Sequence, residues 1–190
     1  MATATIAIFC NANILMTFPF IHSISTLVAP TVRLRVAGAM RGLANYYYEL
    51  RRYDDALAVS DRMVTFVAKN LPPDGSEIAQ SHIDLAGQLL RDRKRPQATA
   101  HFEAAEEAAK VCKIRETCDK LQAQAHAMLG LILLGDGEFE KAEAIIKPMV
   151  NADKDKLQPE LYRMMIKTYA DALRSADREP EAKAVEQKLR

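Results

Sequence analysis

The strongest constraint on the fold of this chain is an internal repeat. Four stretches of the sequence align with one another, and they begin at Met40, His82, His126 and Ile166. Consecutive stretches begin 42, 44 and 40 residues apart. A unit of this length is one supersecondary element that cannot bury its apolar face alone, whereas stacked copies bury a shared core. The period therefore predicts a repeat architecture.

The aligned stretches share columns of similar side-chain size. A large residue precedes a small one in Leu43-Ala44, Leu85-Ala86, Leu129-Gly130 and Tyr169-Ala170. Three residues later each repeat has a bulky side chain: Tyr47, Leu89, Leu133 and Leu173. Nine residues further on each has alanine: Ala56, Ala98, Ala142 and Ala182. Small residues let a second helix approach closely and bulky ones fill the space beside it, so each repeat is expected to be a pair of crossing helices.

The composition agrees with helices. Ala, Leu, Glu, Lys and Arg dominate from residue 40 onward, and these are the strong helix formers. Runs of alternating β-branched residues are absent from that part of the sequence. A chain of 190 residues with 49% apolar content can also bury a core. We predict an all-α solenoid of antiparallel helix pairs, in about four repeats over residues 35–70, 77–112, 119–152 and 158–190.

The segment "GDGEFE" in the third repeat, residues 135–140, raises the alternative of a calcium or phosphate loop. A calcium loop needs oxygen ligands at alternating positions and a bidentate Glu at the end of twelve residues. Here Ala142 and the next apolar run begin too soon, and the segment occupies the same place as the polar turns of the other repeats. The pattern therefore predicts a turn between two helices.

The columns resemble those of tetratricopeptide repeats. The spacing of about forty residues and the linker "NLPPDGSEIAQSHIDLA" are similar to the kinesin-light-chain type of these repeats. The resemblance covers about residues 35 to 190, and it implies a right-handed superhelix. We divide the chain accordingly into an uncharged apolar segment, residues 1–30, and a repeat domain, residues 31–190. Helix 179–189, with Ala182, Val185 and Leu189 on one side, is expected to close the array.

In this family the first helix of each pair lines a concave groove in which ligands sit. The resemblance implies a peptide-binding groove formed here by Arg41, Asn45, Tyr48, Asp84, Gln124, Met128, Leu131, Leu134, Lys167, Asp171 and Arg174. Some such grooves clamp a C-terminal carboxylate, and Arg41 and Asn45 fit half of that clamp. Asp84 would repel a carboxylate, however, and the centre of the groove is apolar. The expected ligand is an extended or helical segment with hydrophobic anchors.

Catalytic, metal and nucleic-acid functions are not supported by the sequence. The net charge is +1, and the one basic run, "RDRKR" at residues 91–95, is short and lacks interleaved aromatics. No Ser/His/Asp or Cys/His arrangement can be assembled, because His82 and His126 share a column with Met40 and Ile166. His101 is expected on the surface. We predict that the protein is not an enzyme and uses no cofactor or metal.

The cysteines and the first thirty residues bear on location. Cys10, Cys112 and Cys118 are an odd number, which suits a reducing compartment, and the latter two are expected to be free thiols rather than zinc ligands. Residues 1–30 contain no Asp, Glu, Lys or Arg. They are compatible with a signal or transit peptide, a membrane span, a leading helix that packs on the first repeat, or an extension outside the folded protein.

Two functions follow from these features. The first is a cytoplasmic, non-enzymatic scaffold that binds a protein or peptide segment in the groove. The alternative is a module of a membrane- or envelope-associated assembly that is tethered through residues 1–30. The sequence does not identify the partner in either case.

Overall fold

The computed structural model describes residues 30–71, 75–152 and 154–189. Within them the chain forms eight α-helices and one short 3-10 helix, with no strand. The helices are α2 (Pro30–Glu49), α3 (Tyr53–Asn70), α4 (Ser76–Arg91), α5 (Arg95–Lys110), α6 (Arg115–Gly135), α7 (Phe139–Ala152), α8 (Pro159–Ser175) and α9 (Glu179–Glu186), followed by η3 (Gln187–Leu189). The predicted segment 1–30 lies outside the described residues except for Pro30.

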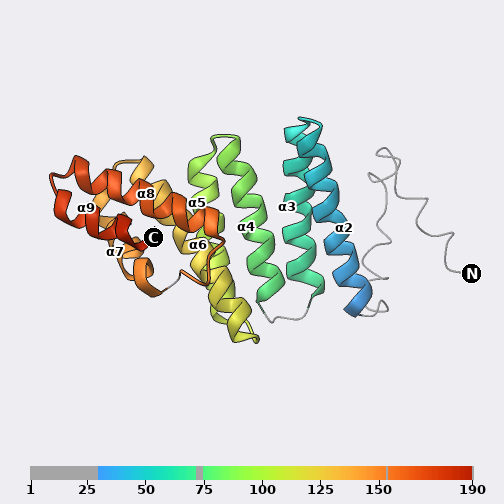
Figure 1. Ribbon diagram of the computed structural model, residues 1–190. Coiled ribbons are helices and arrows are strands. Elements are labelled where there is room, and N and C mark those ends of the chain that lie inside the picture. The colour runs from blue at the N-terminus through green and yellow to red at the C-terminus, as the bar shows by residue number, and fades with distance from the viewer. Residues whose placement is uncertain (1–29, 72–74, 153, 190) are drawn as a thin grey trace, which may run out of the picture.

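Successive helices form antiparallel pairs that stack in chain order (Figure 1). The pairs are α2 with α3, α4 with α5, α6 with α7, and α8 with α9. In Figure 1 helices α2, α3 and α4 stand nearly upright, whereas α8 and α9 lie across the view. The stack therefore twists along its length. No helix within the described ranges has the length and apolar character required to cross a membrane.

Each pair is joined by the same turn. Arg51, Arg93, Gly137 and Asp177 occupy one repeat column, and all four have a positive φ of 57° to 79°. In each turn the next residue donates its backbone N–H to the carbonyl five residues earlier, as Arg52 does to Tyr47 and Glu138 to Leu133. This is the Schellman arrangement that ends a helix. The prediction that "GDGEFE" is a turn is confirmed. Gly137 adopts the left-handed backbone conformation without strain, whereas Arg51 and Arg93 adopt it at some energetic cost.

The small-residue columns form the helix crossings, as predicted. Ala56, Ala98, Ala142 and Ala182 of the second helices are at most 1% exposed. At Gly130 a β-carbon would lie 2.5 Å from Cγ1 of Ile146, so α6 and α7 touch where only glycine fits without rearrangement. Close approach of this kind gives interior packing density along the whole stack.

The closing helix also behaves as expected. Ala182 is fully buried, and Val185 and Leu189 pack against the core cluster that contains Tyr169 and Leu173. Pro180 lies in the first turn of α9, where its missing N–H has no intrahelical partner to lose. The helix is shorter than predicted, because residues 187–189 tighten into a 3-10 turn.

The prediction that Cys112 and Cys118 are free thiols is wrong. They form a disulfide, with Cα atoms 5.6 Å apart. The prediction assumed one continuous helix, on which residues six apart point in nearly opposite directions. The chain instead leaves α5 at Lys110 and starts α6 at Arg115, and the link between them brings the two side chains together. The cysteine count therefore no longer supports a reducing compartment.

Substitution of two glycines should have opposite effects on stability. Gly130→Ala should lower the free energy of unfolding by about 1 to 3 kcal/mol, because the added methyl group overlaps the fully buried Ile146 side chain. Gly42→Ala adds the same methyl group where no atom lies within 4 Å in the middle of α2. It should raise the free energy by about 0.5 to 1 kcal/mol through helix propensity. Denaturant unfolding measures both, and equal effects would contradict the close crossing at Gly130.

The disulfide predicts a definite thiol count. Alkylation of the unfolded chain without reductant should modify Cys10 alone, and alkylation after reduction should modify all three cysteines. Reduction should also lower the free energy of unfolding by about 2 kcal/mol, because the bond closes a short loop in the unfolded chain. Intact-mass measurement gives the count directly. Three modified cysteines without reductant would show that the bond does not form.

Candidate peptide-binding groove

The first helices of the pairs lie side by side on one face of the stack. Helix α4 contacts α6, and α6 contacts α8, in addition to the neighbours of each helix in the sequence. The first helices α2, α4, α6 and α8 thus share one face of the stack, which we call the concave face after the groove that the resemblance implies.

Three repeat columns line this face. The first contains Gly38, Gln80, Gln124 and Met164; the second Gly42, Asp84, Met128 and Thr168; the third Asn45, Gly87, Leu131 and Asp171. All twelve residues are half-buried or exposed. A β-carbon at Gly38 or Gly42 would meet no described atom within 4 Å. The glycines thus leave bare helix backbone on the α2 part of the groove, where a partner can approach closely.

At the α2–α4 end the predicted groove charges neutralise one another. Arg41 Nε lies 2.6 Å from Asp84 Oδ2, and its Nη2 lies 3.4 Å from Glu77 Oε2. Gln80 donates a hydrogen bond of 2.8 Å to the other Asp84 oxygen. Asp84 is therefore held by two neighbours rather than presented as a free acid, and Arg41 links the first pair of helices to the second.

Tyr48 is also engaged within the protein. The Arg91 guanidinium lies 4.4 Å from the centre of the Tyr48 ring, in a cation–π contact between α2 and α4. The Tyr53 ring lies 5.2 Å away on the other side of the turn. Arg91 in addition donates to the Gly87 carbonyl. Asn45, by contrast, is exposed and available to a ligand.

The centre of the groove is formed by α6. Met128 packs against the core cluster of the second repeat, and Leu134 packs against the cluster of the third and fourth repeats. Leu131 lies between them and is half-buried, as is Gln124. These positions recur every three or four residues, so they occupy one side of α6. Part of each leucine surface remains open to a ligand.

The prediction missed one apolar groove residue. Met164 on α8 is 47% exposed and lies in the same column as Gln80 and Gln124. The repeat alignment already placed it there.

At the α8 end the predicted charges again serve the fold. Arg174 lies 2.9 Å from Asp171 on its own helix, and it reaches Glu179 at 3.2 Å and Glu186 at 2.6 Å on α9. The hydrogen bond from Arg174 lowers the pKa of Glu186. Arg174 therefore joins α8 to α9, and Asp171 pairs with it on α8. Lys167 is exposed on α8.

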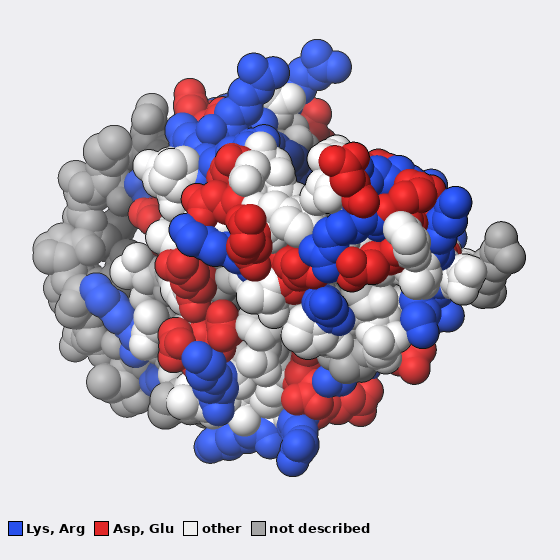
Figure 2. All heavy atoms as spheres, turned by 90° about the vertical axis from the view of Figure 1, so that its left-hand side faces the viewer, with Lys and Arg blue, Asp and Glu red and all other residues white. Residues whose placement is uncertain are grey.

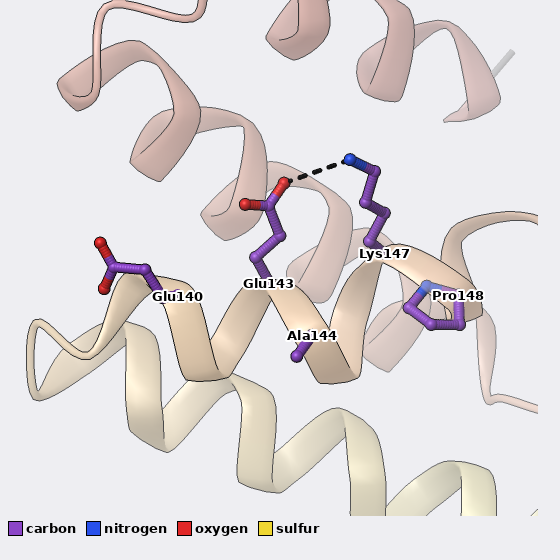
Figure 3. Close-up of a pocket in the computed structure, with 5 residues that line it drawn as sticks. All are labelled: Glu140, Glu143, Ala144, Lys147 and Pro148. Carbon is purple, nitrogen blue, oxygen red and sulfur yellow. Dashed lines mark ion pairs between the residues drawn. The ribbon is translucent and has the colours of Figure 1, made fainter.

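Two shallow hollows lie away from the predicted groove residues. The larger, about 480 Å³, runs along α7 and is lined by Glu140, Glu143, Ala144, Lys147 and Pro148 (Figure 3). The ion pair drawn there is only part of a larger network, because Glu143 also accepts hydrogen bonds from Arg178 and from the Tyr169 hydroxyl. The Arg178 guanidinium, helped by Tyr169, lowers the pKa of Glu143 to about 2. The acid is thus a structural link among α7, α8 and the turn before α9.

The smaller hollow, about 310 Å³, lies between α3 and α5 over α4. Leu57, Ala58, Asp61, Leu85, Leu89, Lys94, Gln97 and His101 line it. His101 was expected on the surface, but it is half-buried, and its Nδ1 lies 2.9 Å from Nδ1 of His82. One ring must donate to the other, so both cannot carry a charge without breaking the contact. Burial, with repulsion from His101, lowers the pKa of His82 to about 4, and burial lowers that of His101 against an opposing effect of Asp61.

The remaining titratable side chains do not assemble into a metal site. Among the residues that the structure describes, no three His, Cys, Asp or Glu side chains are grouped so as to hold a metal ion. His126, predicted as half-buried packing, is half-buried and lies 3.2 Å from Glu106 on the preceding helix.

Known structures share this arrangement. BtubC (BKLC) from P. vanneervenii superimposes with a TM-score of 0.67 at 16% identity, over 80% of this chain and 61% of that one. A putative kinesin light chain with nearly identical TPR-like repeats from Podosopora anserina gives a TM-score of 0.59 at 16% identity, over 80% of this chain and 72% of that one. The chain thus spans about three fifths of the BtubC structure. The fold is that of tetratricopeptide-like repeats.

Likeness at this level of identity carries the fold and not the partner. Neither a comparison with protein-family models nor one with curated proteins finds a match. The tetratricopeptide-like array confirms the predicted α-solenoid of antiparallel helix pairs.

The His82–His101 contact predicts a pH dependence of stability. The unfolded chain binds a proton at His82 near pH 6.5, whereas the folded chain resists it until about pH 4. Stability should therefore fall as the pH is lowered through this window, by about 1 to 2 kcal/mol after allowance for partial solvent exposure. Urea unfolding of the wild type and of His82→Gln from pH 7 to 4 measures the difference. Parallel profiles for the two proteins would contradict a neutral histidine pair.

Proposed function

We propose that the protein is a non-enzymatic scaffold that binds a protein or peptide segment along the concave face of α2, α4, α6 and α8. The observation that carries the proposal is the partly exposed apolar surface at Leu131 and Met164, between groups of charges that are already neutralised within the protein. Few unpaired charges are available there to bind a polar ligand. The exposed parts of the Leu131 and Met164 side chains can instead pack against an apolar side chain of a ligand.

The groove is pre-organised for such a ligand. Arg41 and Asp84 fix α2 against α4, and Arg174 fixes α8 against α9, so little order has to be created on binding. Bare backbone at Gly38 and Gly42 lets the ligand main chain approach α2. Asn45 and Lys167 are exposed at the two ends of the face and can orient polar groups of the ligand. The preferred ligand is therefore an extended or helical segment with apolar side chains at its centre.

A charge at the apolar centre should abolish binding. Partners captured from native lysate by the full-length chain should fall at least tenfold with Leu131→Glu or Met164→Glu, because a central apolar anchor is worth about 2 kcal/mol or more. Ala100→Glu places the same charge on an exposed position of α5, outside the groove, and should leave capture unchanged. Circular dichroism should show unaltered helix content in all three variants.

The outcomes separate the possible binding surfaces. Loss in the groove variants alone supports recognition by the concave face. Equal capture by all four proteins would move binding to another surface, and loss only with Ala100→Glu would place it on the outer helices.

A further inference from the structure

Helix α2 carries an apolar stripe that no described residue covers. The stripe consists of Val32, Val36, Ala39, Leu43, Tyr46 and, directly after the helix, Leu50; we call it the α2 stripe. Its large side chains are between 39% and 57% exposed. Their spacing of three, four or seven residues places them on one side of the helix. In Figure 1, α2 lies at the N-terminal end of the described array.

The same repeat columns are buried in every later repeat. The column of Leu43 contains Leu85, Leu129 and Tyr169, which are at most 6% exposed, and the column of Ala39 contains Ser81, Ala125 and Met165, which are fully buried. The α2 stripe is therefore exposed because of its position at the end of the described stack. Residues of the same kind are buried at the equivalent positions of the later repeats.

The second helix of the preceding pair covers these columns in the later repeats. On α4, Gln88 belongs to the column of Tyr46 and accepts a buried hydrogen bond of 2.9 Å from Ser60 on α3. Leu57 and Val64 of α3 pack against the same α4 core cluster. A segment in the position of such a helix is what the α2 stripe lacks.

The opposite end of the array shows how a terminal face is normally finished. The exposed positions of α9 and η3 include Glu179, Glu181, Lys183 and Lys188. Figure 2 views the molecule from this end and shows acidic and basic side chains interspersed over it. Terminal units of solenoids need such a polar outer face, and a contiguous apolar patch in its place marks an interaction site.

We propose that residues 1–29 cover the α2 stripe, in the place that a second helix takes in the later repeats. The segment joins α2 directly at Pro30 and contains no Asp, Glu, Lys or Arg, which matches an apolar surface. Its length is sufficient, because the longest second helix, α3, has 18 residues and the link after it is residues 71–75. This inference concerns a different surface from the groove and does not rest on the proposed function.

The covalent connection favours this occupant over a second copy of the chain. A tethered segment is present at an effective concentration of about a millimolar, whereas a second copy must associate from dilute solution. The register is also set by the chain, since every other first helix is covered by residues that precede it in the sequence.

Proteolysis of the full-length chain tests the coverage. Chymotrypsin has sites at Phe9 and Phe20, and cleavage there is followed by intact mass. Leu43→Asp introduces a charge into the α2 stripe at a residue that is 41% exposed among the described residues, and it should accelerate this cleavage at least tenfold. Val111→Asp, at an exposed apolar residue in the α5–α6 link, is the matched control and should cleave like the wild type.

Cross-linking identifies the occupant. A bis-maleimide should join Cys10 to the new thiol of Leu43→Cys within one chain, and it should not join Cys10 to Ala100→Cys on the outer face of α5. Equal cleavage of wild type and Leu43→Asp in the proteolysis experiment would overturn the proposal. Cross-linked dimers with concentration-dependent protection would assign the α2 stripe to a second copy. Protection only with phosphatidylcholine vesicles would assign residues 1–29 to a membrane instead.

Discussion

The close crossing of helices at small residues is the contact on which the rest of the structure depends. Four alanines at most 1% exposed and the Gly130–Ile146 contact set the distance between helices in each pair. Because the helices of each pair pack this closely, the large residues of successive repeats meet in three core clusters along the stack. The concave face is a consequence of the same geometry, since it arises where the first helices come closest together.

The fold was predictable because its determinants are local and repeated. The column of small residues, the alanine of the second helix and the turn at Gly137 each occur four times, so one ambiguous copy is corrected by three others. The features that were missed occur once. The Cys112–Cys118 bond depends on where α5 stops, and the contact of His82 with His101 depends on the rotation of two helices about their axes. The repeat columns specify neither the end of α5 nor the rotation of these two helices.

The repeat columns of the proposed groove were predictable, but the pairing of their charges was not. The repeat alignment located its columns, including that of Met164, because they follow from helical periodicity. It could not show that Arg41 pairs with Asp84 or that Arg174 reaches Glu186, since these partners lie on neighbouring helices at distances that only packing fixes. The expected ligand stays the same, but the charges that were expected to orient it are satisfied within the scaffold, so the proposed function relies mainly on the apolar centre.

The ends of the stack explain why the sequence is so uneven in charge. At the C-terminal end of the described array lies α9, a short charged helix held by Arg174. The other face is apolar, and the residues that precede it are uncharged. Gly38 and Gly42 each precede a stripe residue by one position, about 100° around the helix, so the α2 stripe borders the groove. A segment that covers the stripe therefore also forms one wall of the groove at α2, where the helix itself presents only backbone.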